Sequence, residues 1–239
     1  MADTRTVLCI PGPWDDRGAF IRALMESACG YLFAGGILME MTTQQGCTAQ
    51  FEGPDEAMAA AFRSASPHWR DAPEQAAIAS HRSVIYLIDE GGSRERAEAL
   101  MAAAAALIKA GGLGVKVEST GLAHSPAQWL ELADNTGRFS AYRAYVVTIT
   151  GGAEIHTCGM QNFGMHDVRV DASEPDAADL ATQFSWYLFT QTPQLESGHT
   201  FSVDVDAPRY RVEAAEPVDY PPDSLFANPY GTWRLERAD

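Results

Sequence analysis

Side chains capable of chemistry gather in one short block of the sequence, EIHTCGMQNFGMHDVRVD, which runs from residue 154 to 171. His156 and Cys158 are two residues apart, so in a β-strand the imidazole and the thiol would point to the same side. His166 and Asp167 follow residues 161–164, which predict a turn that could fold them back toward the first pair. Such a cluster suggests either a cysteine nucleophile with a histidine base or a metal ion held by nitrogen and sulfur ligands.

The candidate metal ligands are His156, Cys158 and His166, and His199 could complete the set. A histidine and a cysteine two residues apart, with a second histidine eight residues further on, match none of the usual zinc spacings. The residues between them alternate as in an ordinary half-buried strand. The pattern therefore favours structural strand residues over a metal site.

The candidate catalytic residues are Cys158 as nucleophile, His156 or His166 as its base, and Asp167 beside them. A cysteine nucleophile needs a base that produces the thiolate and a site for the oxyanion, and Gly159 would allow close backbone approach. A cysteine beside glycine in a strand is more often a packing residue. We therefore commit to no catalytic residue, metal ligand or cofactor.

The elements that must position this block are largely β-structure. Residues 142–150, 154–160 and 167–171 predict three successive strands, the first two joined as a hairpin through Gly151 and Gly152. The spacing of apolar residues predicts a helix over 176–190. A final strand is expected in the aromatic tail.

The N-terminal half mixes strands and helices. The predicted strands are residues 5–12, 31–43 and 83–90, and a helix is predicted to begin at Pro54. Asp15 or Asp16 predicts the start of a first helix, and Ser93 predicts the start of a long one. Ser125 with Gln128 predicts a capping box. These elements predict an α+β fold with a mixed, largely antiparallel sheet and four to five helices. We expect one domain over 1–239, with lobes 1–120 and 121–239 as the alternative.

Composition excludes several classes of protein. The 239 residues carry a net charge of −15, and no basic stripe with interleaved aromatic residues occurs, which argues against nucleic-acid binding. No apolar run approaches the roughly 20 residues of a membrane helix, which argues against a membrane protein. The four cysteines are scattered, which is typical of reduced thiols. A cytoplasmic location is expected.

Aromatic side chains provide the candidate interaction residues. Trp186 and Phe189 leave the helix over 176–190 with little polar surface, and Tyr230 and Trp233 stand in the proline-rich tail. Such side chains are typical of binding surfaces, and the alternative is a central helix and a tail that folds onto the protein's own core. Together with the acidic charge, they predict a protein partner or self-association.

Four blocks of the chain resemble a known bacterial family: SVIYLIDE, GLGVKVESTGLAHSPAQWLELA, HTCGMQNFGMHDVRV and NPYGTWRL. They are similar to the family called domain of unknown function 4261, and TCGMQNFGMHDVRV and HSPAQW are the most specific pieces. The resemblance covers most of the chain. It implies a bacterial, intracellular protein and carries over no activity, cofactor or catalytic residue.

Three functions are compatible with these patterns. The leading hypothesis is a non-catalytic protein-binding or accessory domain, for which an immunity-like role is an analogy only. The second is a small hydrolase or metal-dependent enzyme that uses His156, Cys158, His166 and Asp167. The third is a domain that binds a small ligand in a cleft between lobes.

Overall fold

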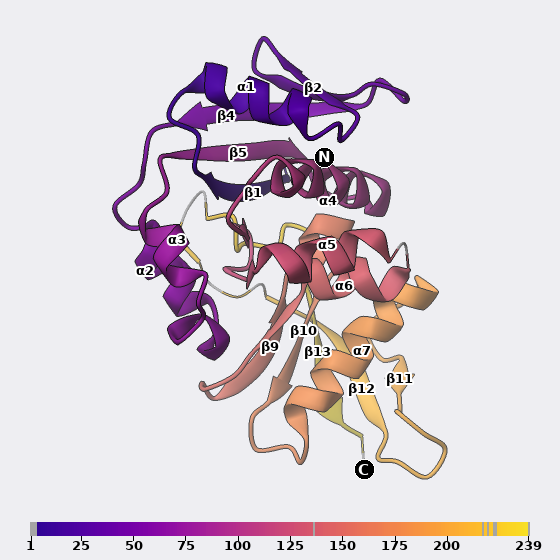
Figure 1. Cartoon of the computed structure of the whole chain (residues 1–239). Helices are drawn as coiled ribbons and strands as arrows, with labels where there is room; N and C mark the ends of the chain where they lie inside the picture. Colours follow the sequence, from indigo (N-terminus) through magenta and orange to yellow (C-terminus); the bar gives the residue numbers. More distant parts are fainter. Residues whose placement is uncertain (1–3, 136, 217, 219, 222–223, 239) are drawn as a thin grey trace.

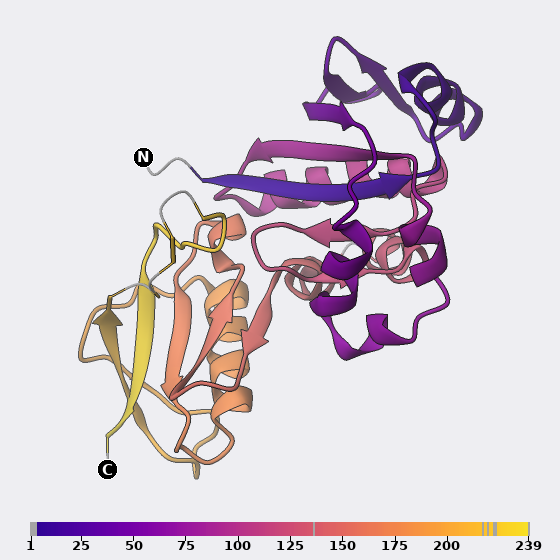
Figure 2. The same ribbon diagram turned by 90° about the vertical axis from the view of Figure 1, so that its left-hand side faces the viewer.

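Two β-sheets organise the chain in the computed structural model, which describes residues 4–135, 137–216, 218, 220–221 and 224–238. The first sheet has the strand order β2-β3-β4-β5-β1-β6-β7, and the second has the order β11-β12-β13-β10-β9-β8 (Figure 1). The sheets come from successive parts of the chain, and Figure 2 shows them as two stacked units. This arrangement confirms the α+β class.

Every strand pair of the first sheet is antiparallel. The strands are β1 (Arg5–Gly12), β2 (Tyr31–Ala34), β3 (Ile37–Glu40), β4 (Gly46–Glu52), β5 (Ser83–Glu90), β6 (Val115–Val117) and β7 (Ala123–His124). The predicted single strand over 31–43 is instead the β2–β3 hairpin. Gly35 and Gly36 both have positive φ, at 60° and 81°, and form its turn.

Helices cover the two faces of this sheet unequally. On the inner face, α1 (Arg17–Glu26) and α4 (Arg94–Lys109) bury apolar side chains against β1, β4 and β5. Asp16 and Ser93 cap these two helices through their side chains, as the sequence predicts. On the outer face, α2 (Met58–Ala65), the 3₁₀ turn η1 (Pro67–Arg70) and α3 (Gln75–Ala79) enclose a smaller core around Cys9 and Val84.

Two helices lead from the first sheet to the second. The α5 helix (Pro126–Asp134) begins with the predicted Ser125–Gln128 capping box. It is followed by α6 (Arg138–Tyr145), which takes in residues 142–145 of the strand predicted over 142–150. Residues 147–149 of that prediction do form a strand. Tyr142 donates to or accepts from the Ser185 hydroxyl at 2.6 Å, and Tyr145 donates to the Ala97 carbonyl at 2.8 Å. These buried contacts outweigh the strand preference of the aromatic residues.

The second sheet packs one face on α7 (Ala177–Gln191), the predicted C-terminal helix (Figure 2). Parallel pairing joins β10 (Asp167–Asp171) to β13 (Thr232–Arg237), and the other pairs are antiparallel. The remaining strands are β8 (Val147–Ile149), β9 (Glu154–Cys158), β11 (Thr200–Phe201) and β12 (Tyr210–Ala215).

Helix number and helix boundaries differ from the prediction in two places. The described residues contain seven α-helices. The sequence did not predict α6, and α3 lies within residues 68–80, where the sequence is compatible with either a loop or a weak helix. The α2 helix begins at Met58 rather than at Pro54, after two turn residues. None of the described helices is both long enough and apolar enough to span a bilayer.

Candidate functional site

The predicted turn between β9 and β10 is a 3₁₀ turn, η2 (Met160–Phe163), that joins the two sheets. Asn162 is 1% exposed, and its side-chain oxygen accepts from Thr6 at 2.9 Å and from Ser119 at 3.1 Å. Its amide nitrogen donates to the Gly159 carbonyl at 2.8 Å. Thr6 belongs to β1, and Ser119 follows β6, so this one side chain links the second sheet's turn to the first sheet.

Cys158 and His156 lie on the β9 face that points away from α7. His156 Nε2 is 3.3 Å from the hydroxyl of Tyr220, which also contacts the Cys158 thiol. Cys158 is 1% exposed, and its thiol donates to the Ser119 carbonyl at 3.4 Å. Burial raises the pKa of this thiol, so it stays protonated at neutral pH and is a weak nucleophile. Burial also lowers the pKa of His156.

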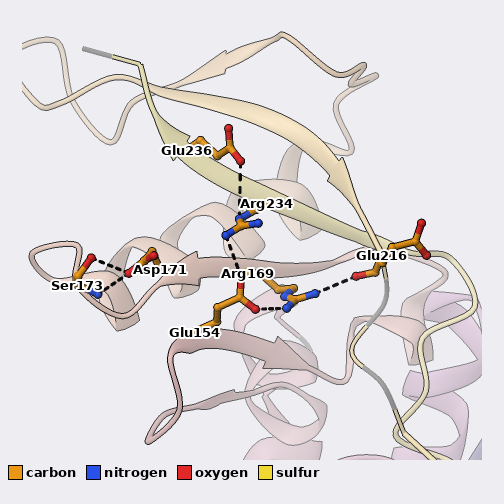
Figure 3. A network of polar contacts seen from close by, with 7 residues as sticks. All are labelled: Glu154, Arg169, Asp171, Ser173, Glu216, Arg234 and Glu236. Carbon is orange, nitrogen blue, oxygen red and sulfur yellow. Dashed lines mark hydrogen bonds and ion pairs between the residues drawn. The ribbon is translucent and has the colours of Figure 1, made fainter.

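A network of charged side chains lies on the second sheet, and Figure 3 shows the contacts among Glu154, Arg169 and Arg234. Arg169 lies opposite His156 in the strand register, and its guanidinium pairs with Glu154 and donates to the Glu216 carbonyl at 3.0 Å. Arg234 reaches the other oxygen of Glu154 at 3.2 Å. The two arginines thus use both oxygens of Glu154, and the network neutralises charge within the sheet surface.

Asp167 is buried between β9, η2 and the tail. Its carboxylate accepts from the Thr157 hydroxyl at 3.1 Å, from the Asn228 amide at 2.7 Å and from the Met160 backbone N–H at 3.4 Å. Burial raises the pKa of Asp167 to about 7, although these three donors oppose the shift. The cavity beside Cys158, Asp167 and Asn228 measures about 10 Å³, which is space for about one water molecule and not for a substrate.

The other two histidines lie apart from this group. His166 stacks on Trp233 with ring centroids 4.9 Å apart, and it borders a separate cavity of about 250 Å³ beside the end of α7. His199 is exposed, and its Nδ1 accepts from the Glu196 backbone N–H at 3.4 Å. Within the described ranges, no three His, Cys, Asp or Glu side chains are grouped so that they could hold a metal ion.

The four aromatic residues predicted for interaction make contacts within the chain. Phe189 is 3% exposed and packs on Phe163, while Trp186 and Trp233 are half-buried. The hydroxyl of Tyr230 is 3.1 Å from that of Thr4. Their part in partner recognition stays a prediction.

Sequence reasoning missed a larger feature at the far end of the first sheet. A groove with a volume of about 570 Å³ lies between α4 and the strands β2 to β5. Tyr31, Leu38 and Cys47 line its sheet side, and Ala99 and Ala102 line its helix side. The alanine-rich sequence of α4 was the available signal, because small side chains on one helix face leave space beside it.

Comparison of the chain with models of known protein families, with curated proteins and with solved structures finds no match. The resemblance to the domain of unknown function 4261 family therefore stays a prediction.

The raised pKa of Asp167 predicts a specific pH dependence. The folded state holds this proton more tightly than the unfolded state, whose pKa is close to 3.8. The contribution of this proton to the free energy of unfolding is fully present below the unfolded pKa. It is lost as the pH rises toward 7, by up to about 1.4 kcal/mol per pH unit. Urea unfolding is measured from about pH 5.5 to 8. The free energy of unfolding should decline more steeply with pH in the wild type than in Asp167→Asn.

The comparison concerns the slope with pH, because Asp167→Asn also changes hydrogen bonds at every pH. Asp206→Asn removes an exposed carboxylate and is the matched control. It should keep the wild-type slope. Equal slopes for wild type and Asp167→Asn would show that Asp167 does not titrate in this range.

Proposed function

We propose that the chain is a non-catalytic domain that binds a protein partner through the β2–β3 end of its first sheet. The observation that carries the proposal is an apolar outer face left uncovered at this end. We call it the hairpin surface and define it by Leu32, Ile37, Met39 and Met41. Leu32, Ile37 and Met41 are 37%, 44% and 55% exposed.

The strand register gathers these side chains on one side. Leu32 pairs with Met39, and Ala34 pairs with Ile37, so Leu32, Met39 and Ile37 point to the face opposite the α1 and α4 core. Met41 directly follows β3. Ile37 also pairs with Thr48, which itself pairs with Ile88, a half-buried residue of β5. The core formed by α2 and α3 uses Cys9, Val84 and Tyr86 and ends before β3. Contiguous exposed apolar side chains of this kind are typical of interaction sites.

The edge of the sheet supports the same proposal. β2 is the first strand in the sheet order, so one side of its backbone has no strand partner among the described residues. Its sequence, YLFA, contains no charge and no proline. Charge and proline are the usual protections of an edge strand, and an edge without them can accept an added strand from a partner.

A catalytic function has weaker support. The candidate nucleophile Cys158 is protonated and 1% exposed, and the cavity beside it holds about one water molecule. An accessory or immunity-like role fits a partner-binding domain by analogy alone.

Replacing Ile37 by glutamate should weaken partner binding by at least about tenfold, because the partner would have to bury a new charge at an apolar contact. The partner is first captured from a lysate of the source organism, then purified and titrated against each variant by calorimetry. Sedimentation velocity over a range of concentrations tests self-association in the same variants.

Val203→Glu is the matched control, because Val203 and Ile37 have the same exposure of 44% and Val203 lies in the loop after β11. It should bind like the wild type. Equal affinities for wild type, Ile37→Glu and Val203→Glu would show that the hairpin surface is not the binding site, as would failure to reconstitute any complex or self-association.

A further inference from the structure

The groove between α4 and the hairpin strands has an apolar floor. Ala99 and Ala102 form its helix side, and Leu38 and Cys47 form its sheet side. The ring of Tyr31 stands at the edge strand β2. Small side chains on the helix opposite medium-sized side chains on the strands leave a volume of about 570 Å³ that neither element fills.

Carboxylates border this floor. Glu40, Asp89 and Glu95 line the groove together with a single cation, Arg96. The Arg96 guanidinium lies 3.1 Å from Asp89 and 3.1 Å from Glu90, so its charge is shared with a carboxylate outside the groove. The three lining carboxylates therefore exceed the cationic charge available to them.

Glu40 is held in place by its own turn. The backbone N–H groups of Thr42 and Thr43 donate to its two carboxylate oxygens. The hydrogen bond from the Thr43 side chain, followed by those from the backbone N–H groups of Thr43 and Thr42, lowers the pKa of Glu40 to about 2, so the carboxylate is ionised at neutral pH. The groove thus presents a fixed negative charge above apolar walls.

We propose that this groove takes an arginine or lysine side chain of the partner that the hairpin surface binds, an inference that rests on the proposed function. The methylene groups of such a side chain match the alanine and leucine floor, and its cationic end matches the carboxylates at the border. An anionic or purely apolar side chain would leave those carboxylates without compensation.

The geometry of the sheet connects the groove with the hairpin surface. Leu38 and Glu40 alternate along β3 with Ile37 and Met39, so the groove and the hairpin surface are the two faces of the same strands. A strand added at the β2 edge would alternate in the same way. Its apolar residues would lie on the hairpin surface, and its intervening basic residues would enter the groove.

The test uses Nα-acetyl-arginine methylamide as the probe and the corresponding citrulline derivative as its neutral isostere. Each is titrated into the millimolar range against the full chain labelled with ¹⁵N, and amide chemical shifts are followed. The arginine probe should give saturable shifts at Tyr31, Glu95 and Ala99, and the citrulline probe should bind at least about tenfold more weakly.

Two variants locate the binding. Ala102→Leu fills the groove from an exposed helix position, and it should abolish the shifts without loss of folding. Ala127→Leu makes the same change at an exposed position of α5 and should leave them unchanged. Glu95→Gln should weaken binding of the arginine probe and not of the citrulline probe.

Several outcomes would overturn the inference: no saturable shifts, equal binding of arginine and citrulline, or shifts that persist in Ala102→Leu. The proposed function fails separately. If Ile37→Glu leaves the partner's affinity unchanged while arginine binds the groove, only the proposal that the partner binds the hairpin surface is wrong. If Ile37→Glu no longer binds the partner while arginine does not bind the groove, only the proposal that the groove takes a basic side chain is wrong.

Discussion

Gly159→Ala is expected to lose at least about 4 kcal/mol of its free energy of unfolding, enough to unfold many domains. Gly159 has φ of 118°, a conformation that residues with a Cβ rarely adopt. A Cβ there would also lie 2.0 Å from the Tyr145 carbonyl oxygen, which is backbone and has little freedom to move. Backbone strain and steric overlap therefore both destabilise this variant at the residue that joins β9 to η2.

Gly151→Ala separates these two causes. Gly151 has a similar φ of 107°, but no atom lies within 4 Å of a Cβ built there. It should lose only the strain energy, about 1–2 kcal/mol. Urea denaturation of both variants, followed by circular dichroism, measures the difference. Similar losses in the two variants would contradict the close packing of Gly159 against α6.

Asn162→Leu is expected to lose about 3–5 kcal/mol, because leucine has nearly the shape of asparagine and none of its hydrogen bonds. The Thr6 and Ser119 hydroxyls would lose a shared acceptor, and the buried Gly159 carbonyl would lose a donor. Breaking these contacts also weakens the link between the two sheets. Unfolding should then become less cooperative and show two transitions by circular dichroism and fluorescence.

Asn135→Leu is the matched control. Asn135 is exposed, and its side-chain amide donates to the Glu131 carbonyl of its own helix. The Asn135→Leu variant should lose no more than about 1 kcal/mol of its free energy of unfolding. A single transition and an equally small loss for Asn162→Leu would show that η2 does not hold the two sheets together.

Most of the polar residues that the sequence offers as candidates for chemistry thus make structural contacts. Asn162 links the sheets, and Asp167 accepts hydrogen bonds from the strand, the turn and the tail. His166 packs on Trp233. The polar residues of the block at 154–171 therefore satisfy buried hydrogen bonds, which a turn between two sheets requires.

Local sequence determined the elements whose signals lie within a few residues. The capping residues Asp16, Ser93 and Ser125 begin the helices that they predict, because a cap depends on the next three backbone N–H groups alone. The apolar run at 83–90 is the strand β5, in which residues of both faces are buried. The α+β class follows from these elements.

Tertiary structure decided the features that depend on distant residues. Residues 138–145 form a helix because Tyr142 and Tyr145 find hydrogen-bond partners on α7 and α4, contacts that no local pattern encodes. The separation into two sheets and the bridging role of Asn162 depend on β1 and on the residues after β6. The acidic groove exists only where α4 crosses the hairpin strands. Spacing along the chain shows which side of an element a residue occupies, whereas the neighbour on that side is set by how the elements pack.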